Sequence, residues 1–499
     1  MRNLIITIVI MLAGIFGSLY GNYSGSVVTD LSSIETTSQN GYEVIEIKDV
    51  YEFTKEIGNP QLPCKTLSYL LPLESSVESI TIISTQIETI SDKMYNVFPT
   101  QPPRGTDGET NDDFVEPNED VYSSGLLYPS DICKIRSEEY RFGYHVVTIE
   151  FYPIQYDTGT KELKIYTDIN FVLNYTNSTE SCIIPEKQSE KVHDLIRKII
   201  KSQVENPNDI DFISGGAKET INQSNFIQTQ TNNKSMPPLP EFMLPEYVIV
   251  TSKELQDEFE ILANWKIKKG IPTIIAYTED IIANYSGIDI KERIRTFLGE
   301  MYGKYGIIYV LLGGDMDIIP TNSTSILPRF DEYYMNISAA AGLELLVGRA
   351  PVEDVKEAEI FISKTINYEK LTNLNEDERT YISNLLMLAG IDGEIGLSSS
   401  GSTPYGTYNR INGEYPDYNC LRLYEVTTLP NSCYLGDMRL NKANAIDALN
   451  GKLVLNNYNG NSALNNNYGI VFHLDHSAYT NIGTGGNSNH DPSVLLRIK

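Results

Sequence analysis

The stretch YVIVTSKELQDEFEILANWKIKKGIPTIIAY, residues 247–277, decides the fold. It opens with the apolar run Tyr247–Thr251, which is typical of a strand buried in a sheet. Apolar residues then share one helical face over Lys253–Lys269, and Gly270 stands where such a helix is expected to end. A second apolar run follows at Thr273–Tyr277. A strand, a helix and a strand of these lengths indicate a βα unit of a parallel sheet.

The same alternation continues towards the C-terminus. Further buried strands are predicted at Ile307–Leu312, Leu385–Ala389 and Gly469–Leu474. Helices are predicted between them at Asp289–Lys304, Glu353–Lys370 and Asn441–Asn450. We therefore expect an α/β domain over residues 243–499 with a mainly parallel sheet. Ligands on such sheets bind at the carboxyl ends of the strands, so the residues that follow each strand are the candidates for chemistry.

Residues 22–204 have a different pattern. Short, alternating, Tyr-rich runs are separated by Pro, Gly, Asn and Asp, which predicts a β-rich domain with a sandwich-like arrangement. Tyr144–Pro153 and Lys164–Tyr175, split by a turn, are expected to form a hairpin. A helix is predicted over Glu186–Val204. Residues 205–242 are rich in Asn, Gln, Ser and Thr and are predicted to be a linker.

Residues 1–21 contain one Arg, a short apolar run and then small residues, as in a secretory signal. No later segment is long and apolar enough to cross a bilayer, so we expect a protein that is secreted or held at the cell surface. The net charge of −27 disfavours nucleic acids and anionic membranes as partners. The five cysteines are scattered without metal-type spacing, so they predict neither a disulfide framework nor a metal site.

Two carboxylates follow the predicted strand Ile307–Leu312, in the segment GGDMDIIP at residues 313–320. Asp315 and Asp317 would lie near the active rim of the sheet and form a candidate substrate or cation loop. The alternative is that Asp315 accepts hydrogen bonds from backbone amides in its own turn. We favour the alternative for Asp315, because short carboxylates do this readily.

The densest cluster of candidate catalytic residues lies at the end of the last predicted strand, at His473-Leu-Asp-His-Ser477. His476 stands at the rim, where it could act as a general base. The spacing of His473, Asp475 and His476 also occurs in the ligand set of metallo-β-lactamase-like hydrolases. Such sites begin with a further His two residues earlier, where this chain has Val471, so a metal would lack a ligand. A metal-dependent hydrolase is therefore the remote alternative, and no metal site is predicted.

Six short motifs occur in order in the second half and together resemble the catalytic domain of the gingipain (C25) peptidases. They are Tyr247-Val-Ile-Val-Thr-Ser, Trp265-Lys-Ile-Lys-Lys-Gly-Ile-Pro-Thr273, Tyr309-Val-Leu-Leu-Gly-Gly-Asp315 with Pro320, Asp331-Glu-Tyr-Tyr334, Val347-Gly-Arg-Ala-Pro351 and Tyr368-Glu-Lys370. The first half, with Gly58-Asn-Pro-Gln-Leu-Pro63, Tyr69-Leu-Leu-Pro72 and Leu163-Lys-Ile-Tyr166, resembles the propeptide of that family. The resemblance implies a secreted zymogen with a caspase-like α/β peptidase domain behind a β-rich pro-domain.

The resemblance also implies roles for individual residues. His476 matches the catalytic His of the family, and Asp392 falls at the position of the acidic residue that orients the imidazole. The amide of Ser477 would contribute to the oxyanion hole. Polypeptides are the implied substrates, and the pro-domain is expected to pack on the peptidase domain. No cofactor is required, and calcium is permitted.

This chain departs from the family pattern at two points. Asp475 and Ser477 replace the glycines that flank the family His. The nucleophilic Cys of the family follows a further helix and strand, and the 23 residues after His476 contain no cysteine. Cys420 and Cys433 precede the His strand, which is the wrong place in the fold. We therefore expect a peptidase domain that is incomplete at its C-terminus, or else a noncatalytic secreted binding or adhesion protein built on the same scaffold.

Overall fold

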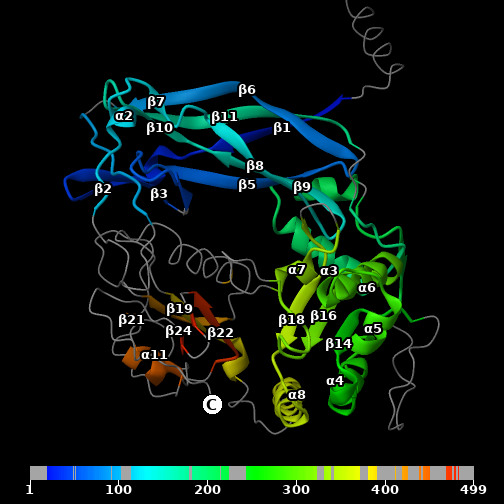
Figure 1. Cartoon of the computed structure of the whole chain (residues 1–499). Coiled ribbons are helices and arrows are strands. Elements are labelled where there is room, and N and C mark those ends of the chain that lie inside the picture. The colour runs from blue at the N-terminus through cyan, green and yellow to red at the C-terminus, as the bar shows by residue number, and fades with distance from the viewer. Residues whose placement is uncertain are drawn as a thin grey trace, which may run out of the picture.

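Figure 1 shows the chain as a computed structural model. The structure describes residues 20–48, 50, 52–90, 93–102, 114–178, 182–213, 215–223, 243–322, 331–338, 342–370, 380–389, 411, 418–424, 438–439, 442–449, 468–474, 477–478 and 481–482. Over these residues the chain forms a β-rich part followed by two α/β sheets. None of the helices described is both long enough and apolar enough to cross a membrane.

The β-rich part consists of two sheets that pack face to face (Figure 1). One contains β1 (Tyr20–Val28), β6 (Ser75–Ile90), β7 (Leu127–Tyr128), β10 (Ile154–Asp157) and β11 (Glu162–Asn177). The other contains β4 (Glu52–Phe53), β5 (Pro63–Leu71), β8 (Cys133–Arg141) and β9 (Tyr144–Phe151). The alternating residues Ile169, Phe171 and Leu173 of β11 face Val147, Ile149 and Phe151 of β9 in one hydrophobic cluster. A hairpin of β2 (Ile34–Gln39) and β3 (Tyr42–Ile47) and the short α2 (Glu119–Tyr122) complete this part.

The hairpin predicted from Tyr144–Pro153 and Lys164–Tyr175 is wrong. β9 pairs with β5 and β8 in one sheet, whereas β11 pairs with β1, β6 and β10 in the other. All eight residues of β9 are buried, so this strand lies inside the structure and has a neighbour on each side. The chain changes sheets at Tyr152-Pro153, and the actual hairpin is the shorter β10–β11 pair.

A short connecting region leads out of the β-rich part. It contains β12 (Lys187–Ser189), α3 (Glu190–Lys201), η2 (Pro207–Asp211) and β13 (Glu219–Ile221). The predicted helix Glu186–Val204 begins later than expected, because Ser189 is its N-cap and accepts from the amide of Val192 at 3.2 Å. The interval 205–242 was expected to be a linker, but its first part is structured, with Ile210 buried and β13 paired to β12.

The first α/β sheet is parallel, with the order β15 (Thr273–Tyr277), β14 (Tyr247–Thr251), β16 (Tyr309–Gly313) and β18 (Leu346–Ala350). One face packs against α4 (Gln256–Lys268) and α8 (Val355–Lys370), and the other against α5 (Thr278–Asn284) and α6 (Ile290–Tyr305). The alternating strand residues Val248, Val250 and Ile249 divide between these two clusters. Along the chain, the short α7 (Glu332–Met335) and β17 (Gly342–Leu343) follow β16 and precede β18.

The second α/β sheet is also parallel, with the order β21 (Met438–Arg439), β20 (Asn419–Tyr424), β19 (Asn384–Ala389) and β22 (Ile470–Leu474). The helix α11 (Lys442–Leu449) covers one face through Ala445 and Ala448. The short strands β23 (Ser477–Ala478) and β24 (Asn481–Ile482) follow β22. We expected a single sheet, and the structure corrects this: β19 is buried on both faces and flanked by β20 and β22, which leaves it no edge for β18.

Candidate active site

The turn after β16 carries the two carboxylates predicted as a substrate or cation loop. Asp315 Oδ1 accepts from the amides of Asp317 and Ile318 at 3.0 and 3.3 Å. The carbonyl of Asp315 accepts from the amide of Ile319 at 2.9 Å, and its own amide donates to Val352 at 3.0 Å. Asp315 is therefore a capping residue of its own turn, as the alternative interpretation described. Asp317 is exposed beside it.

Arg349, in β18, holds this turn in place. Its Nη1 donates to the carbonyl oxygens of Gly314, Asp315 and Ile319 at 2.8, 3.0 and 2.9 Å. Its Nε and Nη2 donate to the two carboxylate oxygens of Asp331 at 2.8 and 2.6 Å. A bidentate, largely buried pair of this kind is among the strongest polar contacts in proteins. Sequence reasoning quoted the motif that contains Arg349 but assigned this residue no role.

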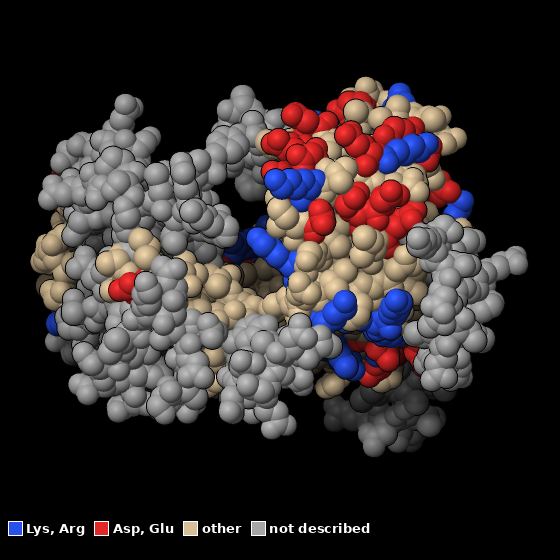
Figure 2. All heavy atoms as spheres, turned by 90° about the horizontal axis from the view of Figure 1, so that it is seen from below, with Lys and Arg blue, Asp and Glu red and all other residues tan. Residues whose placement is uncertain are grey.

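The edge of the first sheet at the carboxyl ends of its strands is acidic. The helices α4, α5 and α8 begin there, and their first turns carry Asp257, Glu258, Glu279, Asp280 and Glu357. Figure 2 views the molecule from this side and shows Asp and Glu side chains gathered on it. Carboxylates at helix N-termini offset the positive end of the helix dipole, so their position has a structural reason. Nowhere in the described ranges do three His, Cys, Asp or Glu side chains form a group that could hold a metal ion.

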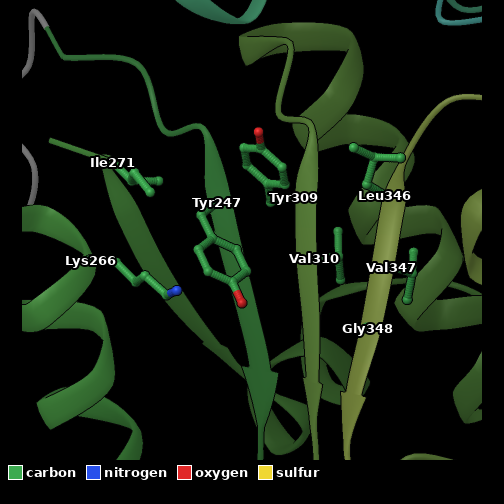
Figure 3. A pocket seen from close by; sticks show the side chains of 8 residues that line it. All are labelled: Tyr247, Lys266, Ile271, Tyr309, Val310, Leu346, Val347 and Gly348. Atoms are coloured by element: carbon green, nitrogen blue, oxygen red, sulfur yellow. The ribbon is translucent and has the colours of Figure 1, made fainter. Parts of the chain in front are cut away.

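A pocket of about 340 Å³ lies at the opposite, amino ends of the same strands (Figure 3). The rings of Tyr247 and Tyr309 meet edge to face, with centroids 6.0 Å apart. Lys266 reaches over the Tyr247 ring at 5.7 Å, and its charge is balanced by Glu369 at 2.5 Å. A Cβ added at Gly348 would meet no atom within 4 Å, so the pocket is open there. It is thus remote from the edge at which chemistry is expected on such a sheet.

The predicted catalytic residues follow strands of the second sheet. β19 and β22 are parallel neighbours, with Ala389 opposite Leu474 at their carboxyl ends. Asp392 comes three residues after Ala389 and His476 two after Leu474, and both lie outside the described residues. The register therefore brings together the two strand ends from which these residues follow. Ser477 lies in β23, opposite Ile482. The roles of Asp392, His476 and Ser477 stay predictions.

The described cysteines do not lie at that edge. Cys420 is the second residue of β20, opposite Leu385, and is buried against Leu385 and Met387. It precedes the carboxyl end of its strand by four residues, or roughly 13 Å. Burial raises the pKa of the Cys64 thiol, and it raises those of Cys182 and Cys133 to about 12 and about 11, which disfavours the reactive thiolate. Cys433 lies outside the described residues.

Comparison with known families gives two matches along the chain. The model of peptidase family C25 matches residues 241–493. The model of the C25 propeptide matches residues 27–211. The two matches are in the order of a precursor, with the propeptide first.

Individual relatives come from Porphyromonas gingivalis. Gingipain R1 is 23% identical over 376 residues, which are 75% of this chain and 33% of that protein. Gingipain R2 of strain W83 is 24% identical over 376 residues, 75% of this chain and 45% of that protein. Lys-gingipain W83 is 19% identical over 378 residues, 74% of this chain and 20% of that protein. The chain thus spans less than half the length of these relatives.

Solved structures show weaker similarity. The complex of the RgpB pro- and mature domains of Porphyromonas gingivalis is 18% identical, with a TM-score of 0.30 over 38% of this chain and 92% of that one. The Arg-specific cysteine proteinase gingipain R (RgpB) is 21% identical, with a TM-score of 0.34 over 50% of each chain. The assignment therefore rests on sequence. Because the peptidase model alone covers half of its residues, the chain belongs to peptidase family C25, and it carries the propeptide of that family ahead of the peptidase region.

Proposed function

We propose that this chain is the precursor of a secreted endopeptidase of the cysteine type. The observation that carries the proposal is the tandem match of a C25 propeptide at residues 27–211 and a C25 peptidase at residues 241–493. A propeptide in the same chain is what a peptidase made in latent form requires. The apolar leader at residues 1–21 supports export.

The proposed chemistry takes place at the carboxyl ends of β19 and β22. His476 removes the proton from the thiol of the nucleophilic cysteine that the family resemblance implies, a role assigned to none of the described cysteines. Asp392 accepts a hydrogen bond from the imidazole of His476 and orients it. The thiolate adds to the peptide carbonyl carbon, and the amide of Ser477 stabilises the oxyanion. The C–N bond then breaks, the amine leaves with the proton from His476, and water hydrolyses the thioester. The pairing of Ala389 with Leu474 supports this arrangement, because it brings the two strand ends together.

None of the described cysteines is assigned as the nucleophile. Cys420 lies at the amino end of its strand, and burial raises the pKa values of Cys133 and Cys182. This observation favours a second candidate function, that of a noncatalytic secreted binding protein. The proposed reaction requires no cofactor, and calcium is permitted as a structural ion.

The proposal is tested on the secreted protein purified with its native C-terminus. After the segment between residues 223 and 243 is cut, we expect hydrolysis of an unfolded protein substrate. Iodoacetamide should abolish it, and the zinc chelator 1,10-phenanthroline should not, because a thiolate and not a metal is proposed to act. The matched control is Cys420→Ala, which should retain full activity.

Two outcomes would argue against this function, and a third would argue against the site assigned to it. No hydrolysis under any condition would favour the binding protein. Loss of activity with the chelator alone would favour a metal site at His473, Asp475 and His476. Loss in Cys420→Ala would place the nucleophile in β20.

A further inference from the structure

The strand β18 lies at one edge of the first α/β sheet. Within the described residues the order of that sheet is β15, β14, β16 and β18, so β18 has a neighbouring strand on one side only. Figure 1 shows it on the side of the first sheet that is nearer to the second sheet. The backbone groups on the outer side of an edge strand can pair with a further strand. An extended polypeptide segment could therefore add to the sheet here.

The hydrogen bonds of β18 show which of its backbone groups are directed outward. The amide of Leu346 donates to the carbonyl of Ile308, directly before β16, at 2.8 Å. Successive residues of a strand direct their backbone groups to opposite sides, so Leu346 and Gly348 pair with β16. The N–H and C=O groups of Val347 and Arg349 are therefore directed away from β16. They are the groups that an added strand would use.

The pocket at the amino ends of the strands opens beside the middle of β18 (Figure 3). Gly348 is exposed, and the rings of Tyr247 and Tyr309 lie in the same pocket. Side chains that stand opposite each other on neighbouring strands are in contact, and an aromatic side chain packs well across a glycine of an edge strand. Lys266 is already balanced by Glu369, so a neutral ring suits the pocket better than a charged group. An added strand would thus place one aromatic side chain opposite Gly348.

The segment that follows β18 is acidic and exposed. Residues 351–357 contain Glu353, Asp354 and Glu357 against one cation, Lys356, and all four of these residues are exposed. They stand at the acidic edge that Figure 2 shows. An added strand would run towards these carboxylates. A Lys or Arg roughly two to four residues from the aromatic residue would therefore meet charges of opposite sign.

We propose that β18 binds an extended polypeptide segment that carries an aromatic residue and, a few residues away, a basic one. The segment pairs with the outward backbone groups of Val347 and Arg349, its ring enters the pocket beside Gly348, and its cation lies against the acidic edge. This inference deepens the proposed function and rests on it, because an endopeptidase takes extended polypeptides as substrates. The site holds the substrate on the side of the first sheet that is nearer to the second.

The test measures peptide binding by the full chain after its thiols are alkylated with iodoacetamide, which blocks the proposed hydrolysis. The probe is fluorescein-labelled Thr-Lys-Thr-Trp-Thr-Lys-Thr, which reads the same in both directions. Its anisotropy should rise and saturate with a Kd of about 10–100 µM, as for a weak contact. Replacing Trp by Gly, or both Lys by Glu, should weaken binding by about tenfold or more. Equal affinity of the probe and either replacement would overturn the proposal.

Two variants separate the pocket from the backbone edge. A Cβ at Gly348 meets nothing within 4 Å, so Gly348→Val should fold and fill the opening of the pocket. Val347→Pro removes an outward N–H and keeps the pairing with β16, since an edge strand accepts proline where its N–H faces solvent. Each variant should bind the probe about tenfold more weakly.

The control is Gly299→Ala in α6, whose Cβ would meet only Ile183, at 3.9 Å, and which should bind as wild type. Unchanged binding in a folded Gly348→Val would overturn the proposal, whether or not Val347→Pro folds.

The outcomes also separate this site from the proposed function. Probe binding without hydrolysis by the untreated protein would support the site and contradict the function. Hydrolysis without probe binding would overturn the site and leave the function in place. A dimer of the chain that Val347→Pro dissociates, detected by gel filtration, would assign the edge to a second copy and overturn the proposal.

Discussion

In the part of the chain that the structure describes, each of the two parallel sheets has four strands, but the sheets differ at the carboxyl ends of those strands. In the first sheet the turn after β16 uses its polar groups internally, with Asp315 on backbone amides and Arg349 on three carbonyls and Asp331. In the second sheet the strand ends of β19 and β22 lie side by side and lead into the predicted Asp392 and His476. A carboxylate at this edge of a sheet is therefore not catalytic by position alone. What matters is whether its own loop already occupies its hydrogen-bonding capacity.

The largest expected effect would come from breaking the Arg349 network in the first sheet. Arg349→Met removes the donor of the Asp331 carboxylate and of two carbonyls, those of Gly314 and Ile319, and should lower the free energy of unfolding by about 3–5 kcal/mol. Urea denaturation measures the loss. Arg136→Met, which breaks an exposed pair with Glu52, should cost less than about 1 kcal/mol. Similar losses of unfolding free energy in the two variants would show that the Arg349 hydrogen bonds stabilise the fold no more than an exposed ion pair does.

The packing of α4 against one face of the first sheet can be tested by adding a side chain at a glycine. Gly313 ends β16, and a Cβ there would stand 2.6 Å from the ring of Phe259, which is fully buried in α4. Gly313→Ala should therefore destabilise the protein by about 1–3 kcal/mol. Gly348→Ala, in β18, should be close to neutral because nothing lies within 4 Å of its added Cβ. Thermal unfolding of both variants checks the difference, and an equal shift would contradict it.

Two carboxylates of the first α/β unit should contribute to the free energy of unfolding with opposite dependences on pH. Burial raises the pKa of Glu344 above 4.5, against the hydrogen bonds from Ser338 and Ile337. The folded state then binds the proton of the Glu344 carboxyl more tightly than the unfolded state does. The contribution of this carboxyl to the free energy of unfolding is therefore largest below pH 4.5 and is lost as pH rises through the raised pKa. Glu344→Gln should remove that loss.

Glu369 should behave in the reverse way. Burial tends to raise its pKa, but hydrogen bonds from Lys266, Lys269 and Trp265 outweigh this and hold the pKa below 4.5. Its contribution is present above pH 4.5 and is lost as pH falls through the lowered pKa. Glu369→Gln should flatten only this acidic side of the profile. The free energy of unfolding measured from pH 3 to 8 tests both, and two slopes of the same sign would refute the assignment.

The smallest expected effect concerns the link between the two sheets. Tyr368, in the last turn of α8, donates to the carbonyl of Gly469, directly before β22, at 2.9 Å. Tyr368→Phe should cost about 0.5–1.5 kcal/mol and speed amide exchange in β22. Tyr305→Phe, a partly exposed tyrosine that ends α6, is the control and should leave that exchange unchanged. Unchanged exchange in both variants would show that this hydrogen bond does not couple the sheets.

Sequence reasoning predicted β14 and β15 to the residue, because both are continuous apolar runs between a turn and a helix. The predicted start of β16 was two residues too early, because Ile307 and Ile308 are apolar without belonging to the strand. They fill hydrophobic clusters beside the sheet, and the amide of Ile308 bonds to Glu246. The family and its propeptide were recognised from short motifs and are confirmed. The role of Arg349 could not be predicted, since its partners come from three segments that meet only in space.

We propose that hydrolysis takes place at the carboxyl edge of the second sheet, whereas the polar groups at the carboxyl edge of the first sheet stabilise the fold. Peptide hydrolysis by the protein with its native C-terminus tests it most directly, with His476→Ala set against Asp315→Asn. His476→Ala should lower kcat/KM by about a thousandfold or more, because the general base is lost. Asp315→Asn should stay within about threefold of wild type, because an amide oxygen can still cap the turn. Full activity in His476→Ala, or an equally large loss of activity in a folded Asp315→Asn, would show that the two edges do not divide in this way.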